Sequence, residues 1–391
     1  MSSFLLVIAS ILITLFVAEI ILRISHLVQI RRVKYIPKLM CQDKCAGGDL
    51  CPNIQPILLK GKEFSTTLFT NNLGCYDRPY NGEENVILLV GDSFTFGHAD
   101  FPNKYGTLLE RYLDYRILKC GVGGYGTYQE FCKIKKILNM IKVKPKLLII
   151  GYWYGDDMRN DLDMAENGIL PNEMLANTDI SSSVDYKLTH SADSRLLSIK
   201  KWIQGHLMLY YVFNKNILVR SIFSRFGFVD TYANFVPFVS VNKFPQLQKG
   251  WQLHLNILKK IKHWTDQQNI KLLIVLLPAD FQVYDFLKPK QDIYDFDQPV
   301  RMLSAFFKEN EIRYFDILPY MRQYANKTPR LYINNQKDFY WREDGHFNDK
   351  GNRLVALLLA RYILEEKILD IENAESKKQD IERWLEEYIQ K

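Results

Sequence analysis

The sequence predicts an α/β fold in which a parallel sheet carries helices on both faces. Short apolar runs typical of strands alternate with stretches of helical periodicity along most of the chain. The composition agrees with a globular core, because 47% of the 391 residues are hydrophobic and 24% are charged. A chain of this length can bury a sizeable core, as one large domain or two smaller ones.

The segment 1–30 departs from this average and predicts a membrane anchor. Phe4 to Leu22 is apolar except for small polar residues and Glu19, and at about 1.5 Å per residue it nearly matches the thickness of a bilayer core. No positively charged side chain precedes it, so an uncleaved transmembrane helix is expected rather than a signal peptide. A buried core helix is the alternative.

The charge pattern and the cysteines disagree about the side of the membrane. Net charge is +7, and the basic residues nearest the apolar stretch follow it, which favours a cytoplasmic body by the positive-inside rule. An extracytoplasmic body is favoured if the six cysteines form disulfides; a zinc site and unpaired buried thiols are the alternatives. The cysteines are Cys41, Cys45, Cys51, Cys75, Cys120 and Cys132. Because no run of five or six Lys or Arg occurs, nucleic acid is not an expected partner.

The elements follow in order after the anchor. Residues 31–84 are rich in proline and glycine and predict an irregular connector. The main domain is expected over 85–369, with a long insertion at 158–245. The aromatic and basic middle of this insertion is expected to pack on the core, and capping of the active site or contact with lipid are the alternatives. The predicted strands are Val86–Val90, Arg116–Leu118, Lys146–Tyr152, Ile270–Leu277 and Arg313–Ile317. The predicted helices are Tyr105–Tyr115, Glu130–Ile141, Trp251–Gln268 and Lys350–Lys367.

The tail 370–391 predicts an amphipathic helix that docks on the body or on a partner. Its apolar face consists of Ile381, Trp384, Leu385, Tyr388 and Ile389.

A serine stands where a parallel sheet exposes its ligand-binding edge. Gly91-Asp92-Ser93 follows the strand Val86–Val90, and open parallel sheets bind ligands at the carboxyl ends of their strands. A serine on such a strand-to-helix turn can expose its hydroxyl and aim its backbone N–H at the group it attacks, as a nucleophile must. Capping of the next helix is the alternative role for Ser93.

A candidate base lies in the segment Glu343-Asp344-Gly345-His346 near the other end of the chain. A serine nucleophile needs a base, and the base needs a carboxylate that orients it. In an extended loop Asp344 and His346 lie on the same side, so the carboxylate can accept from Nδ1 and leave Nε2 for Ser93. No other histidine has a carboxylate two or three residues before it, and His98, close to Ser93, is the one competitor.

Two further segments follow predicted strands, the glycine-rich turn Gly121–Gly126 and Gly155-Asp156-Asp157. Together with Gly91-Asp92-Ser93 and Asp344-Gly345-His346 they resemble, in order, the motif blocks of the SGNH (GDSL-type) serine hydrolase superfamily, in its N-terminally membrane-anchored bacterial form. The resemblance spans residues 70–365. It implies a flavodoxin-like three-layer α/β/α sandwich with no metal and no organic cofactor.

The resemblance also implies roles for the site residues. Ser93 is the expected nucleophile, His346 its base, and Asp344 the orienting carboxylate. Many members place that carboxylate three residues before the histidine, where this chain has Glu343. The anchored bacterial members often use the closer position, so Asp344 is preferred.

An oxyanion hole is expected from the backbone N–H groups of Ser93 and Gly124. The family's third donor is an asparagine side chain, and this chain has Asp156 there. An ionised carboxylate cannot donate a hydrogen bond. Asp156 is therefore expected to be protonated, to be turned away, or to mark a chain that has lost hydrolysis.

The expected function is that of a serine esterase or acyl hydrolase. The expected substrates are acylated envelope glycans, such as O-acetylated ones, or lipid esters. An O-acyltransferase acting on an envelope polysaccharide would share the acyl-enzyme. A membrane-tethered glycan-binding protein with impaired catalysis is the alternative that Asp156 motivates. Phosphate binding by the Gly121–Gly126 turn is disfavoured, because no P-loop lysine follows it.

Overall fold

The computed structural model describes residues 2–25, 39–61, 63–153, 155, 157–166, 170–171, 174, 245–284, 295–325, 338–341 and 344–390. The chain divides into two compact units, which are described separately. One comprises 1–36 and 182–236, and its described part is a single helix. The other comprises 37–181 and 237–391 and contains all the remaining described elements.

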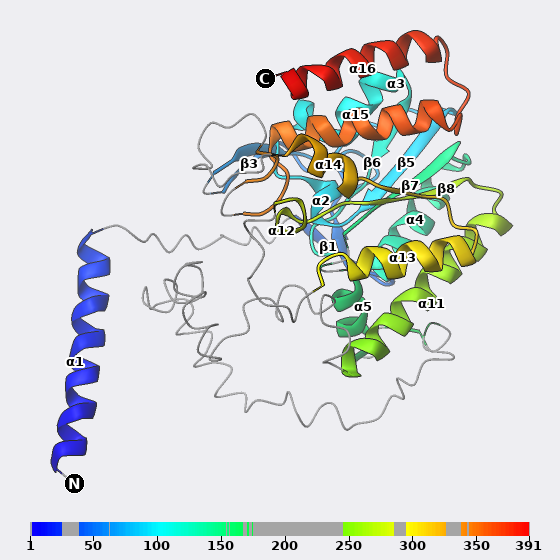
Figure 1. The fold of residues 1–391 in the computed structure, drawn as a ribbon. Helices are drawn as coiled ribbons and strands as arrows, with labels where there is room; N and C mark the ends of the chain where they lie inside the picture. The colour runs from blue at the N-terminus through cyan, green and yellow to red at the C-terminus, as the bar shows by residue number, and fades with distance from the viewer. Residues whose placement is uncertain are drawn as a thin grey trace. The chain divides into compact units, whose positions relative to one another are not determined.

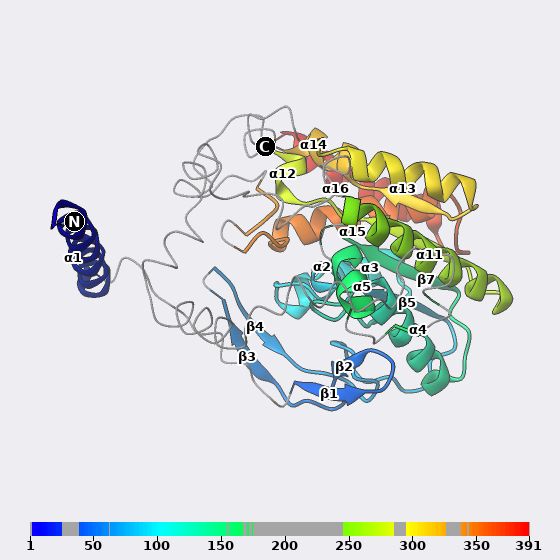
Figure 2. The same ribbon diagram turned by 90° about the horizontal axis from the view of Figure 1, so that it is seen from below.

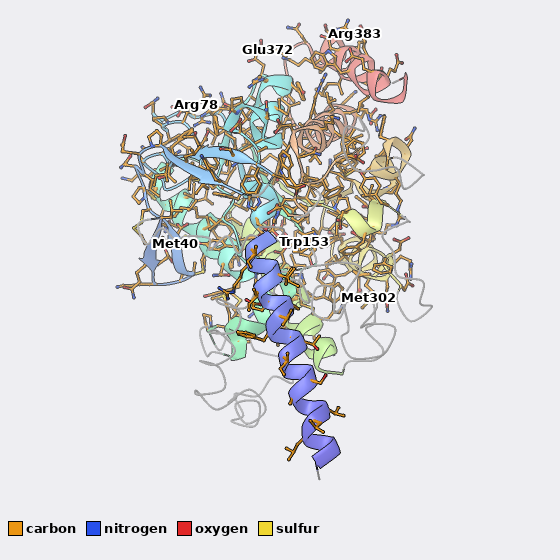
Figure 3. All side chains as sticks on the ribbon, turned by 90° about the vertical axis from the view of Figure 1, so that its left-hand side faces the viewer. Met40, Arg78, Trp153, Met302, Glu372 and Arg383 are labelled. Atoms are coloured by element: carbon orange, nitrogen blue, oxygen red, sulfur yellow. A yellow bond between two sulfur atoms is a disulfide. The ribbon has the colours of Figure 1, made fainter. Side chains whose placement is uncertain are left out.

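Helix α1 (Ser2–Ser25) extends over the segment predicted to be an anchor. It has 24 residues, and its side chains extend outward along the helix (Figure 3). The exposed apolar side chains include Leu6, Phe16 and Ile24. Arg23 Nε donates to Glu19 Oε1 over 2.9 Å, one turn away. Among the helices that the structure describes, none is both long and apolar enough to cross a membrane, so the predicted transmembrane anchor is not supported.

Five parallel strands form the central sheet of the second unit, in the order β6-β5-β7-β8-β9. In chain order they are β5 (Val86–Gly91), β6 (Arg116–Lys119), β7 (Leu147–Tyr152), β8 (Leu272–Leu276) and β9 (Tyr314–Asp316). This is the 2-1-3-4-5 order of flavodoxin-like sheets. The first four strands are buried throughout, because helices cover the sheet on both faces.

Helices pack on both faces of this sheet (Figures 1 and 2). One face carries α3 (Tyr105–Leu113), α15 (Asp349–Glu365) and α16 (Ala374–Gln390). The opposite face carries α4 (Thr127–Ile141), α5 (Asp157–Glu166), α11 (Pro245–Gln267) and α13 (Gln298–Glu309). The predicted α/β fold with a parallel sheet between two helical layers is confirmed.

The C-terminal helix α16 docks on the body. Ile381 and Leu385 are buried in the main core, and the ring of Trp384 lies 5.2 Å from that of Tyr112 on α3. The predicted apolar face therefore packs on α3 and α15. The side chains of Tyr388 and Ile389 are outside the described residues.

The connector predicted to be irregular contains two antiparallel hairpins. The first pairs β1 (Met40–Asp43) with β2 (Gly47–Leu50), and the second pairs β3 (Ile57–Lys60) with β4 (Ser65–Leu68). These strands are four residues long and include glycine or polar residues, which in sequence are typical of turns. Most of the insertion predicted at 158–245 lies outside the described residues.

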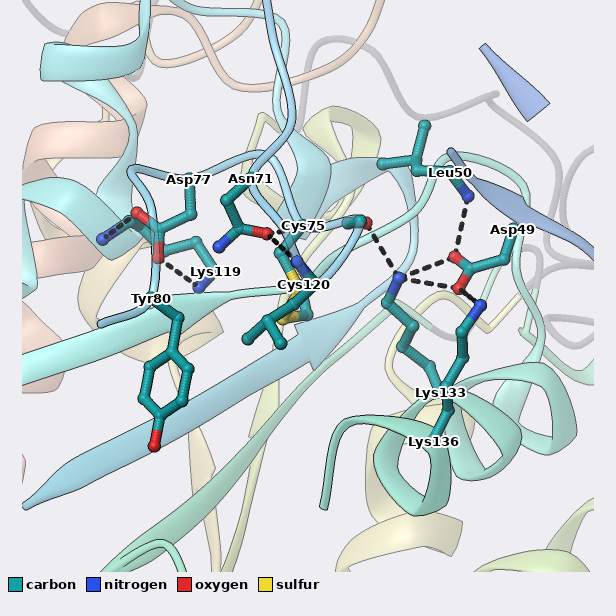
Figure 4. The surroundings of a disulfide bond; sticks show 12 residues. Asp49, Leu50, Asn71, Cys75, Asp77, Tyr80, Lys119, Cys120, Lys133 and Lys136 are labelled. Carbon is teal, nitrogen blue, oxygen red and sulfur yellow. Dashed lines mark hydrogen bonds and ion pairs between the residues drawn. A yellow bond between two sulfur atoms is a disulfide. The ribbon is translucent and has the colours of Figure 1, made fainter. Parts of the chain in front are cut away.

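Disulfides tie this connector to the α/β body. All six cysteines are paired, so the zinc and free-thiol alternatives are wrong. The bonds are Cys41–Cys51, Cys45–Cys132 and Cys75–Cys120. The first closes the β1–β2 hairpin, the second joins that hairpin to α4, and the third reaches the residue that follows β6 (Figure 4).

A buried ion pair reinforces the attachment to α4. Lys133 is only 1% exposed and pairs with Asp49 of β2 over 2.7 Å. The same ammonium donates to the carbonyl of Gly74 at 2.9 Å, and Lys136 also reaches Asp49 (Figure 4). A buried lysine needs such partners, because an unpaired charge in the interior is costly.

Candidate active site

The last residue of β5, Gly91, lies where only a glycine fits. Gly91 has φ +155°, and a Cβ there would lie 2.1 Å from Thr95 Oγ1 and 2.5 Å from the carbonyl oxygen of Gly151. The chain can therefore turn sharply against β7 and present Ser93 at the carboxyl edge of the sheet.

Ser93 is the first residue of the short helix α2 (Ser93–Phe96). Asp92 caps this helix, since its Oδ1 accepts from the backbone N–H of Phe94 at 2.8 Å. The capping role that the sequence left open for Ser93 thus belongs to Asp92. The backbone N–H of Ser93 has no acceptor within the helix, because the first amides of a helix have none.

The Ser93 hydroxyl meets an imidazole from the far end of the chain. His346 Nε2 lies 2.8 Å from Ser93 Oγ, and His346 Nδ1 lies 2.7 Å from Asp344 Oδ1. Because an ionised carboxylate only accepts, Nδ1 donates to Asp344 and Nε2 keeps the lone pair that accepts from the serine. The structure thus brings the three predicted residues into one chain of hydrogen bonds.

Asp344 is held in its ionised form. Burial pushes the pKa of this carboxyl upward, but the hydrogen bonds from His346 and His98 outweigh burial and leave the pKa well below its ordinary value. The Glu343 alternative lies outside the described residues.

His98 approaches Asp344 rather than Ser93. Its Nδ1 lies 2.8 Å from Asp344 Oδ1, and its ring centroid is 4.2 Å from that of His346. Within the described part of the chain, the histidine that hydrogen-bonds Ser93 is His346. The sequence motif could not show this second imidazole, because the contact joins residues 246 positions apart.

A tight turn holds the histidine loop in front of α15. The backbone N–H of Trp341 donates to the His346 carbonyl at 2.8 Å, and Gly345 donates back to Trp341 at 3.0 Å. Gly345 has φ +79°, a conformation that favours glycine. Asn348 then caps α15 by accepting from the N–H of Gly351 at 3.0 Å.

The glycine turn after β6 lies beside Ser93. A Cβ on Gly123 would lie 3.9 Å from Ser93 Cβ, and Val122 N–H donates to the carbonyl of Gly91 at 2.9 Å. Gly124 has φ +78°, and among the described residues its backbone N–H finds no acceptor. The role of Gly124 as an oxyanion donor stays a prediction.

Asn160 of α5 fixes this turn, and the sequence motifs did not reveal it. Its Nδ2 donates to the carbonyl oxygen of Gly124 at 3.0 Å. A Cβ on Gly126 would come within 2.8 Å of Asn160 Cβ, so the glycine permits close packing of the turn on α5. Asp156, the residue expected at the third oxyanion position, lies outside the described residues.

A second chain of polar groups runs through the core beneath the turn. Asp161 Oδ2 lies 2.9 Å from His254 Nδ1, and His254 Nε2 lies 2.8 Å from the hydroxyl of Tyr152. Burial raises the pKa of Asp161, although His254 opposes the rise. All three side chains are fully buried, so they join α5 to α11 and β7 rather than meet a ligand.

Asp280 also belongs to this edge of the sheet. It begins the short helix α12 (Asp280–Val283) after β8. Burial raises its pKa to about 6, and the charge of His346 acts against the rise. No motif marks this residue in the sequence.

His98, Asp344 and His346 also have the donor types that bind divalent cations. Their ligand atoms lie within 4.8 Å of one another. The hydrogen bonds from both imidazoles to Asp344 account for this clustering on their own.

Comparison with solved structures finds similar chains. The acetyl xylan esterase AlAXEase is 16% identical, with a TM-score of 0.36 over 69% of this chain and 96% of that chain. A lipase/acylhydrolase from Enterococcus faecalis is 16% identical, with a TM-score of 0.35 over 71% and 95%. A GDSL-like lipase from Bacteroides thetaiotaomicron is 12% identical, with a TM-score of 0.32 over 73% and 90%.

No family model matches the sequence, and no curated protein matches it.

Proposed function

We propose that this chain is a serine hydrolase of ester bonds, with Ser93 as nucleophile, His346 as general base and Asp344 as the orienting carboxylate. The observation that carries the proposal is the pair of hydrogen bonds, 2.8 Å and 2.7 Å, that links Ser93 Oγ through His346 to Asp344. A serine hydroxyl is a weak nucleophile unless an adjacent base accepts its proton.

The proposed reaction uses His346 as a base, because its proton is on Nδ1 and its Nε2 can accept another. Ser93 Oγ attacks the ester carbonyl carbon while its proton passes to His346 Nε2, and Asp344 stabilises the imidazolium that forms. The imidazolium then protonates the departing alcohol, which leaves Ser93 acylated. Water attacks the acyl group with His346 again as base, releases the carboxylic acid and restores the serine.

The backbone N–H groups of Ser93 and Gly124 are the proposed oxyanion donors. The cap of Asp92 fixes the turn at Ser93, and the hydrogen bond from Asn160 fixes the turn at Gly124, which supports donors that are in place before charge develops on the carbonyl oxygen. Loss of a single such donor typically costs ~100- to 1,000-fold in kcat.

We propose an oxidising compartment for the body, because disulfides persist there. The proposed substrate class is an O-acylated glycan or a lipid ester, as the motif resemblance implies. Acyl transfer to a glycan would use the same acyl-enzyme with a sugar hydroxyl in place of water.

The test is hydrolysis by the full chain of nitrophenyl acetate, a nitrophenyl ester of a longer acid, and an O-acetylated xylan. We expect Ser93→Ala to lower kcat by roughly 10⁴-fold or more. A fluorophosphonate probe should label the wild type and not this variant. Ser65→Ala, at an exposed serine of β4, is the matched control and should keep full activity. Equal turnover by the wild type and Ser93→Ala would refute the proposal.

A further inference from the structure

His98 is an imidazole that the proposed reaction does not use, yet it binds the same carboxylate oxygen as the base. We infer that His98 is a positioning residue, which fixes Asp344 and thereby holds His346 in the orientation and tautomer that accept a proton from Ser93. The inference rests on the proposed function.

Both imidazoles converge on one atom. His98 Nδ1 and His346 Nδ1 lie 2.8 Å and 2.7 Å from Asp344 Oδ1. Because the carboxylate oxygen has two lone pairs and no proton to give, each nitrogen donates one hydrogen bond. A single bond from His346 would leave the carboxylate free to turn about its side-chain torsion. The second donor comes from a different segment of the chain and removes that freedom.

His98 is itself held on both sides. Its ring stacks on Phe64 at a centroid distance of 4.6 Å, and its carbonyl oxygen accepts from Trp341 Nε1 at 3.0 Å. The backbone N–H of the same tryptophan donates to the carbonyl of His346 at 2.8 Å. Trp341 thus ties the main chains of the two histidines together, and the two rings meet the carboxylate from fixed positions.

A neutral His98 suits this role. Burial lowers its pKa, against the hydrogen bond to Asp344, and the nearby charges of His346 and Lys104 act in the same direction as burial. Among the residues that the structure describes, the groups whose charges act on it are Asp344, His346 and Lys104. A neutral imidazole donates to Asp344 without placing a second positive charge beside His346 when that ring takes up a proton.

Two substitutions separate the hydrogen bond from the ring. His98→Phe keeps an aromatic ring to stack on Phe64 but has no donor. His98→Asn loses the ring, but its amide nitrogen occupies nearly the position of Nδ1 and can donate. We expect His98→Phe to lower kcat by roughly 10- to 100-fold, the range for a lost hydrogen bond to a charged group, with KM nearly unchanged. His98→Asn should stay within about threefold of the wild type. His263→Phe, at an exposed histidine of α11, is the control.

A second measurement does not depend on turnover. In ¹⁵N-histidine-labelled protein, nitrogen chemical shifts show which ring nitrogen carries the proton. We expect His346 to be protonated at Nδ1 in the wild type and in His98→Asn, and to become a mixture of tautomers in His98→Phe. Equal losses of kcat in the two variants, or an unchanged tautomer in His98→Phe, would overturn the inference. If the wild type cleaves no ester and the probe does not label Ser93, the proposed function fails, and the tautomer measurement still decides the role of His98.

Discussion

His346 Nε2 lies 2.8 Å from Ser93 Oγ although 253 residues separate the two in the sequence. Ser93 follows β5, and His346 precedes α15, which packs on α3. Asn352 of α15 accepts from the backbone N–H of Tyr105 at the start of α3, over 3.0 Å. The contact between His346 and Ser93 therefore depends on how α15 docks on α3.

The proposed orienting role of Asp344 predicts a large loss of activity from a small change. In Asp344→Asn the amide can donate to Nδ1, which moves the imidazole proton to Nε2 and leaves no lone pair for Ser93. We expect kcat for nitrophenyl acetate to fall by roughly 10⁴-fold with KM little changed. Asp266→Asn, at an exposed position of α11, should match the wild type. Retained activity in Asp344→Asn would assign the orienting role to another carboxylate.

Much of the fold follows from local sequence, and so do the place of Ser93 and the pairing of Asp344 with His346. The strands are apolar runs, and each expected strand and helix of the sandwich appears with its ends shifted by a few residues. Ser93 is recognisable because it directly follows a strand, and the spacing of Asp344 and His346 sets their contact within one turn. These relationships lie within a few residues, where spacing determines geometry.

The rest of the site could not be predicted, because it arises from packing between distant segments. His98 reaches Asp344, and Asn160 reaches Gly124, across loops whose paths the sequence does not define. The pairing of the cysteines is hidden for the same reason, since Cys45 bonds a residue 87 positions away. The hairpins of the connector were missed because their strands are too short to show a period.

The contact between Asn160 and the glycine turn predicts a measurable loss of catalysis. Asn160→Ala removes the hydrogen bond to the Gly124 carbonyl, so the turn can move and its N–H loses alignment. We expect kcat to fall by roughly 3- to 10-fold, as for one neutral hydrogen bond. Asn160→Asp should be worse, because its carboxylate repels that carbonyl. The esterase assay gives kcat, and an unchanged melting temperature would show that the fold is intact. A change in KM alone would mean that Asn160 serves substrate binding.

The disulfides Cys75–Cys120 and Cys41–Cys51 should contribute unequally to stability. In the loop-entropy model, the Cys75–Cys120 bond closes a loop of 45 residues and contributes about 4 kcal/mol, while Cys41–Cys51 closes 10 and contributes about 3 kcal/mol. The double variant Cys75→Ser/Cys120→Ser should therefore unfold at lower denaturant than Cys41→Ser/Cys51→Ser. Urea unfolding of both variants, followed by circular dichroism, measures the difference. The opposite order would show that contacts around the bonds outweigh loop entropy.

Asp280 predicts how stability changes with pH. Its pKa is raised from 3.8 to about 6 in the folded chain, so the folded state binds the proton more tightly than the unfolded state does. The stability that this tighter proton binding contributes is fully present below pH ~4 and is lost as the pH rises through about 6.

The variant Asp280→Asn stays neutral at every pH. In the wild type the Phe281 N–H donates to Asp280 Oδ1 over 2.7 Å, and the asparagine oxygen can still accept this bond. The variant should exceed the wild type in unfolding free energy by roughly 1–3 kcal/mol at pH about 8. At pH about 4 the two proteins should be equally stable. Urea unfolding at both pH values measures this, with Asp266→Asn as the exposed control. A difference of the same size at both pH values would mean that the substitution changes packing and not the charge at position 280.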